Sequence, residues 1–202
     1  MPDASTIQRS LAGAWRLMTG RSDGLRLLDI SVDGFWDSFF AIAVALPALL
    51  MGWAIAADQV AVDPLVADSR LSLVLKLALI DLAVWIVPIA GFVAVAGPAG
   101  LSPRMTHLVV AYNWGEALFA WITLPVAVVF LMVDLDQQLA DGIMLIVFLA
   151  LAVLSWRLVT TALGRGPGIG SAVFGGMFVL SLVVLIALES MLDIYPSPPL
   201  AG

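Results

Sequence analysis

Apolar residues dominate five long stretches of the chain, separated by short polar connections. A helix of roughly 20 apolar residues matches a bilayer hydrocarbon core of about 30 Å, and each stretch reaches that length. Backbone polar groups in a bilayer must pair within their own segment, which favours helices. The pattern predicts five transmembrane helices, at residues 35–57, 71–97, 108–133, 142–163 and 169–192.

Composition supports one membrane domain. The chain has 202 residues, of which 62% are hydrophobic and 12% charged, whereas soluble domains average about 25% charged residues. We therefore expect an all-α, polytopic membrane helical bundle at residues 35–192. An amphipathic lead at residues 1–34 precedes it, and a short extracytoplasmic tail at residues 193–202 follows it.

The reactive side chains are few. The chain has no cysteine and a single histidine, His107, which excludes disulfides, thiolate metal sites and bis-histidine haem within one chain. It also lacks the Gly-x-Ser-x-Gly and His-Glu-x-x-His motifs of hydrolases. We expect no enzymatic activity, no cofactor, no metal and no nucleic-acid partner.

The basic residues are distributed unevenly among the connections. Four arginines lie in the lead, and Arg104 and Arg165 lie in the second and fourth connections. Aspartates gather in the first and third connections, where Arg70 is the sole basic residue. Since Lys and Arg mark cytoplasmic loops, we predict a cytoplasmic N-terminus and a periplasmic C-terminus in a bacterial inner membrane.

The lead contains an apolar stripe. Ile7, Leu11, Trp15 and Met18 are spaced by four, four and three residues, which places them on one side of a helix. The pattern predicts a short amphipathic helix at the inner membrane surface, with Trp15 at headgroup depth. A partner-docking helix is the alternative.

The first and third spans share a spacing. Trp36 precedes Pro47 by eleven residues, and Trp114 precedes Pro125 by the same number. Two interpretations remain open: a parallel repeat of a helical hairpin, or two unrelated helices with similar features. In both, each proline removes a backbone hydrogen bond and is expected to kink its helix.

Five polar residues fall within or near the apolar cores: Lys76, Asp81, Asn113, Glu116 and Arg157. A charged group at the centre of a membrane helix costs at least about 2.5–3.5 kcal/mol, so these residues form the candidate intramembrane site. One interpretation is structural, with a Glu116–Arg157 ion pair and with Asp81 held by Lys76, by a hydroxyl or in a protonated state. The second is a proton or ligand site, and the third is contact with a partner subunit.

Small residues repeat at four-residue spacing on the fifth span, as Ser171 with Gly175 and Ala172 with Gly176. Small residues let membrane helices approach closely. This face is expected either to pack inside the bundle or to form a homodimer contact.

Two short stretches resemble known membrane proteins. Val32-Asp33-Gly34-Phe35-Trp36 resembles the Asp-Leu-Tyr-Gly-Pro-Phe-Trp motif of the Yip1 superfamily, without the Leu-Tyr pair and the proline. Ala111-Tyr112-Asn113-Trp114 is similar to a stretch of small five-helix Yip1-like proteins of alphaproteobacteria, whose function is unassigned. The resemblance implies a non-enzymatic helical bundle that acts through membrane or protein contacts.

Two functions therefore stay open. The first is an accessory or interaction subunit, or a membrane-organising Yip1-like protein, with the lipid bilayer and either a membrane-protein partner or a second copy as partners. The alternative is a small transporter or a component of a proton-coupled permease, which would use Asp81 and Glu116.

Overall fold

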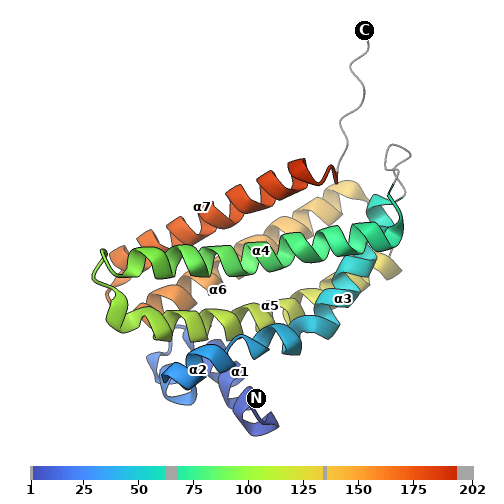
Figure 1. Ribbon diagram of the computed structural model, residues 1–202. Helices are drawn as coiled ribbons and strands as arrows, with labels where there is room; N and C mark the ends of the chain where they lie inside the picture. The colour runs from blue at the N-terminus through green and yellow to red at the C-terminus, as the bar shows by residue number, and fades with distance from the viewer. Residues whose placement is uncertain (1, 62–67, 134–135, 195–202) are drawn as a thin grey trace.

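The structure, a computed structural model, describes residues 2–61, 68–133 and 136–194 (Figure 1). Its elements are helical in all three of these ranges. Their bounds are α1 Ala4–Met18, η1 Ser22–Leu27, α2 Val32–Asp37, α3 Phe40–Val60, α4 Arg70–Ala96, η2 Ser102–Arg104, α5 Met105–Met132, α6 Gln137–Leu163 and α7 Pro167–Met191.

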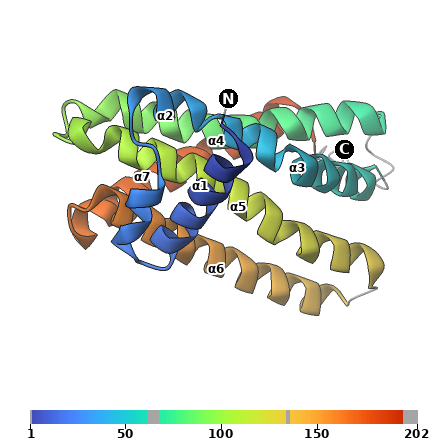
Figure 2. The same cartoon turned by 90° about the horizontal axis from the view of Figure 1, so that it is seen from below.

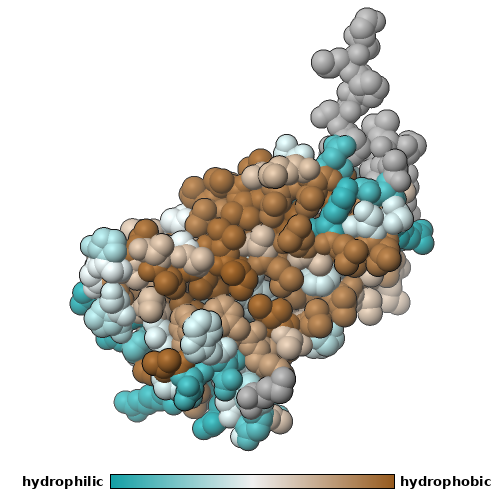
Figure 3. Space-filling model, in the orientation of Figure 1, coloured by the Kyte–Doolittle hydropathy of each residue, from teal (hydrophilic) through white to brown (hydrophobic). Residues whose placement is uncertain are grey.

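The described ranges contain five helices or helix pairs that are long and apolar enough to cross a membrane. They are Val32–Val60, Arg70–Ala96, Ser102–Met132, Gln137–Leu163 and Pro167–Met191. The predicted number and order of the spans are thus confirmed. Figure 3 shows the corresponding surface, on which apolar residues cover the flank of the bundle and hydrophilic residues gather toward its ends.

Polar caps explain why three helices begin outside their apolar stretches. Ser31, Ser69 and Asp136 each accept a hydrogen bond from a backbone N–H three residues later, at the starts of α2, α4 and α6. Such side chains satisfy donors that the first helical turn leaves unpaired. At the other end, α6 stops at Gly164, whose φ of 58° suits glycine.

The five spans form a closed ring. Going around the ring, α3 packs on α5, α5 on α6, α6 on α7, α7 on α4, and α4 on α3. Contacts across the ring, between α4 and α5, are sparse. The two ends of the ring differ in charge: the basic end includes Arg104 and Arg165, and the acidic end includes Asp58, Asp68 and Asp141.

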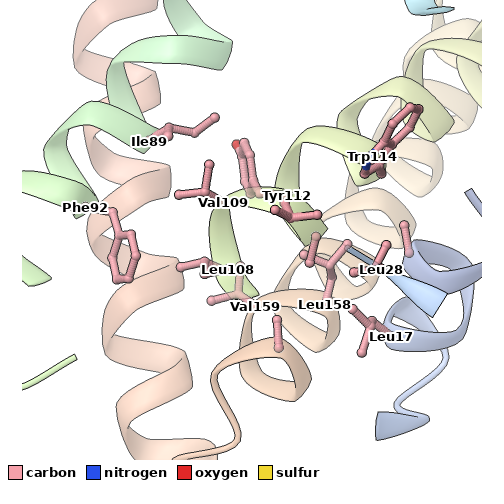
Figure 4. Close-up of a cluster of buried hydrophobic side chains, with 14 of the residues drawn as sticks. Leu17, Leu28, Ile89, Phe92, Leu108, Val109, Tyr112, Trp114, Leu158 and Val159 are labelled. Atoms are coloured by element: carbon pink, nitrogen blue, oxygen red, sulfur yellow. The ribbon is translucent and has the colours of Figure 1, made fainter. Parts of the chain in front are cut away.

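The N-terminal helix α1 packs across α5 and α6 near the basic end, as the view from below shows (Figure 2). Its buried residues are Ser10, Gly13, Ala14, Leu17 and Met18. Figure 4 shows Leu17 and Leu28, from α1 and from the segment after η1, beside Leu158 of α6.

The helix at the N-terminus therefore forms, but its bundle-facing side is rotated from the predicted stripe. Met18 is fully buried and Ile7 and Leu11 are partly buried, while Trp15 is 47% exposed. On the adjoining side, Gly13 lies against the following segment of the lead, because a Cβ atom added to it would be 2.9 Å from the backbone oxygen of Gly24. The position of α1 at a membrane surface stays a prediction.

The two halves of the proposed repeat differ in their surroundings. Trp36 is 68% exposed, whereas Trp114 is buried. The first span is interrupted at residues 38–39, and helix α3 runs continuously past Pro47. Helix α5 likewise continues through Pro125.

The small-residue face of α7 is largely open. A Cβ atom added to Gly175 or Gly176 would meet no other atom within 4 Å. Ser171 accepts a hydrogen bond from Trp156 of α6 at 2.9 Å. Close helix packing instead uses Gly170, whose added Cβ would lie 2.8 Å from the Cα of Thr160 on α6. The expectation that the face packs inside the bundle is therefore not met at these two glycines.

Candidate functional site

A cavity of about 340 Å³ lies inside the ring, at mid-length of the spans. All five spans contribute to its walls, with Leu49 on α3 and, on the other four, side chains that include Phe119, Phe148 and Phe174. The wall is mostly apolar. Its polar members are Asp81, Tyr112, Glu116, Thr123, Ser155 and Ser181.

Two of these polar residues carry carboxyl groups, Asp81 on α4 and Glu116 on α5. No Lys, Arg or His lines the cavity among the described residues. Both carboxyl groups thus share a mostly apolar space with no basic side chain on its wall. Their charges would repel one another there, and each would lack a partner cation.

Asp81 is held by a tryptophan of the neighbouring helix. The indole N–H of Trp53, a buried residue of α3, donates to Asp81 Oδ2 at 2.7 Å. Asp81 is itself an exposed residue, which places it at an edge of the cavity. The hydrogen bond fixes the carboxyl group and ties α3 to α4.

Glu116 lies deeper in the bundle than Asp81 and is partly buried. Tyr112, one helical turn earlier on α5, lines the same cavity and is a polar neighbour of Glu116. A neutral hydroxyl can orient a carboxyl group, but it supplies no counter-charge. Glu116 therefore has a polar neighbour without a cationic one.

Asn113 belongs to a different network. Its side-chain oxygen accepts the indole N–H of Trp85 from α4 at 2.9 Å, and its amide donates to Ser38 Oγ at 2.8 Å. Asn113 and Ser38 are buried. The network joins α4, α5 and the α2–α3 junction beside the cavity, on its basic-end side.

The remaining two candidate residues lie away from the cavity. Arg157 is exposed and donates to the backbone oxygen of Thr19 at 2.6 Å, so it holds the end of α1 rather than Glu116. Lys76 pairs with Asp68 and donates to the backbone oxygen of Leu192 at 2.7 Å. The structure therefore brings two of the five candidates together in the cavity.

Sequence reasoning passed over Trp53, Trp85 and Tyr112 as site residues. A signal was present for the tryptophans, because both lie inside an apolar span rather than at its ends. An indole N–H in hydrocarbon needs an acceptor, and the nearby carboxyl and amide side chains are the available ones. Their pairing across helices depends on the ring order, which the sequence does not state.

The cavity suits a monovalent cation or a proton better than a structural divalent ion. Ca²⁺ and Mg²⁺ take six or more oxygen ligands, often several of them charged. The described residues contain no group of three or more His, Asp or Glu side chains placed to hold a metal. Two carboxyl groups and a few hydroxyls in an apolar wall are suited to one positive charge.

Comparison with known proteins adds no assignment to this geometry: the chain matches no family model, no curated protein and no solved structure.

Proposed function

We propose that this protein is a small membrane transporter, or a component of a proton-coupled permease, whose central cavity binds a cation. Asp81 and Glu116 are its two charge-bearing groups. The observation that carries the proposal is the pair of carboxyl groups in one apolar cavity without a basic lining residue.

The physical argument concerns charge in a medium of low polarity. An uncompensated carboxylate inside a bilayer costs at least about 2.5–3.5 kcal/mol, and two in one cavity cost more because they repel. That free energy is recovered when a proton or another cation enters the cavity. A structural ion pair would remove the cost permanently, but the basic residues Lys76 and Arg157 have partners elsewhere.

The test is a rapid pH jump applied to proteoliposomes on a solid-supported membrane, with the displaced charge recorded. We expect a transient current from the unmodified protein, because protons enter or leave the cavity. Asp81→Asn combined with Glu116→Gln should remove most of this current. Glu189→Gln is the matched control, since Glu189 is also on a span but does not line the cavity.

Each variant is first shown to be folded by circular dichroism and a monodisperse gel-filtration peak. An undiminished current in the folded double variant would show that the cavity carboxyl groups do not exchange protons and would refute the proposal.

A second candidate function, an accessory subunit with a Yip1-like, membrane-organising role, is favoured by the open face of α7 around Gly175 and Gly176. Such a face suits close contact with another membrane helix. Native mass spectrometry after gentle extraction should then detect a stoichiometric partner or a second copy. Gly176→Leu should release it, whereas Gly142→Leu, at another glycine with open space around it, should not.

We also propose residence in a bacterial inner membrane with the basic end in the cytoplasm. The support is the separation of arginines at one end of the ring from aspartates at the other.

A further inference from the structure

Two further hollows lie on either side of the central cavity. One, of about 390 Å³, is a groove between the basic-end halves of α4 and α7. The other, of about 190 Å³, lies between the acidic-end halves of α3, α5 and α6. The three hollows therefore lie at successive depths along the bundle.

Each neighbouring pair of hollows shares one lining residue. Met177 of α7 lines both the groove and the central cavity. Thr123 of α5 lines both the central cavity and the acidic-end hollow. Met177 is buried, and its unbranched thioether side chain has three rotatable bonds. Met177 can thus change rotamer at the boundary that the groove and the cavity share.

The polarity of the walls changes along this series. The groove has no polar side chain, and it lies at the surface where Val95 is 54% and Ile169 43% exposed. The central cavity contains both carboxyl groups. The acidic-end hollow adds Gln59 beside Thr123. The series runs from a lipid-facing apolar groove to an anionic cavity and then to a weakly polar hollow.

From this arrangement we propose that the protein takes up an amphipathic organic cation directly from the lipid leaflet at the basic end. The cation passes through the α4–α7 groove and past Met177 to Asp81 and Glu116, and leaves past Thr123 toward the acidic end. This inference rests on the proposed function, because it uses the same carboxyl groups as the cation site.

The walls define the class of ligand. A strongly hydrated inorganic cation would lose its water in the groove without gaining any polar partner. A cation whose charge is delocalised or shielded by apolar groups avoids that cost and still gains from the two carboxyl groups. The volumes of the groove and the cavity, about 390 and 340 Å³, are at the lower end of the range of small-molecule sites.

The probe is radiolabelled tetraphenylphosphonium, a delocalised lipophilic cation, added to the protein in lipid nanodiscs. Both the equilibrium affinity and the association rate are measured. We expect the double variant Asp81→Asn with Glu116→Gln to bind at least about tenfold more weakly, a loss of about 1.4 kcal/mol.

The route is tested by narrowing the groove at residues that do not line the central cavity. Ala172→Trp, on α7, and Ala99→Trp, just after α4, are the two variants. Each should slow association at least about tenfold while the equilibrium affinity changes little, and the retained affinity shows that the variant is folded. Ile186→Trp is the control, since Ile186 is 58% exposed on α7 and outside the groove.

The outcomes distinguish failure of the uptake route or of the ligand class from failure of the proposed function. Association of both groove variants at the unmodified rate overturns the route, and absence of carboxyl-dependent binding overturns the ligand class. In either case the proposed function stands if the pH-jump current still depends on Asp81 and Glu116. Loss of that dependence overturns the proposed function and this inference together.

Discussion

Closure of the ring depends on a close approach between α6 and α7, which can be tested by a substitution at Gly170. A Cβ atom built on Gly170 would lie 2.5 Å from the hydroxyl oxygen of Thr160 and 2.8 Å from its Cα. The Cα belongs to the backbone of α6, so a rotamer change cannot relieve the contact. Gly170→Ala therefore requires the two helices to separate.

The loss of stability expected for Gly170→Ala is estimated by comparing it with Gly176→Ala on the same helix. Inserting a methyl group into a well-packed contact typically costs about 1–3 kcal/mol. Replacing glycine by alanine in a helix also contributes up to about 1 kcal/mol of stabilisation through the backbone. Gly176→Ala should gain only the backbone stabilisation, because no other atom lies within 4 Å of its added Cβ. The difference between the two variants thus isolates the packing cost, at about 1–3 kcal/mol.

The assay is reversible unfolding in mixed lipid–detergent micelles, titrated with sodium dodecyl sulfate and followed by circular dichroism. Gly170→Ala should unfold at a lower detergent fraction than the unmodified protein, and Gly176→Ala at the same fraction or a higher one. Equal midpoints for the two variants would contradict the close α6–α7 contact, and with it the closed ring around the cavity.

Two further predictions concern polar contacts outside the cavity. Asn113→Leu leaves the Trp85 indole N–H without its acceptor and removes a donor to Ser38. We therefore expect the free energy of unfolding to fall by about 1–3 kcal/mol in the same assay, and to fall by less when the substitution is made in a Trp85→Phe background. Hydrogen bonds from Lys76 and Ser72 lower the pKa of Asp68 below its ordinary value. The ionised Asp68 carboxylate therefore stabilises the folded protein above about pH 4, and this stabilisation disappears as the pH falls through the lowered pKa. Stability measured across that interval should lose part of its pH dependence in Asp68→Asn, and an unchanged profile would show that the Lys76 contact does not favour the ionised form.

The spans were predictable because bilayer thickness acts on each segment separately. A helix of sufficient apolar length needs no knowledge of its neighbours. The ends of the helices are less predictable, because the apolar residues alone do not mark where a helix starts. Helices α2 and α6 start at Val32 and Gln137, directly after the capping residues Ser31 and Asp136, which lie outside the apolar stretches.

The site was only partly accessible from the sequence. Asp81 and Glu116 stood out because carboxyl groups are costly in apolar spans. Their surroundings depend on which helices are neighbours and how each is rotated. Arg157 shows the limit: its depth on α6 is similar to that of Glu116 on α5, yet its side chain donates to the backbone of Thr19, directly after α1. Depth along a helix follows from residue counting, whereas direction around it does not.

Three indole hydrogen bonds connect α3, α4 and α5 to one another within the apolar region. Trp53 donates to Asp81, Trp85 to Asn113, and Trp121 to the backbone oxygen of Val44 at 3.0 Å. In lipid, hydrogen bonds and close packing hold helices together, because apolar contacts between helices compete with equally apolar lipid tails. These three helices therefore form the fixed side of the ring.

Helix α7 is held differently. In the described part of the chain, the hydrogen bonds that join α7 to its neighbouring spans lie near its ends, at Ser171 and at the Leu192 backbone oxygen. Its middle contributes Phe174, Met177 and Phe178 to the cavity wall, and these side chains make apolar contacts that lipid or a lipophilic ligand can replace at small cost. The middle of α7 is thus the part of the ring that separates with the least loss of polar contacts, and it is the same part that divides the groove from the two carboxyl groups.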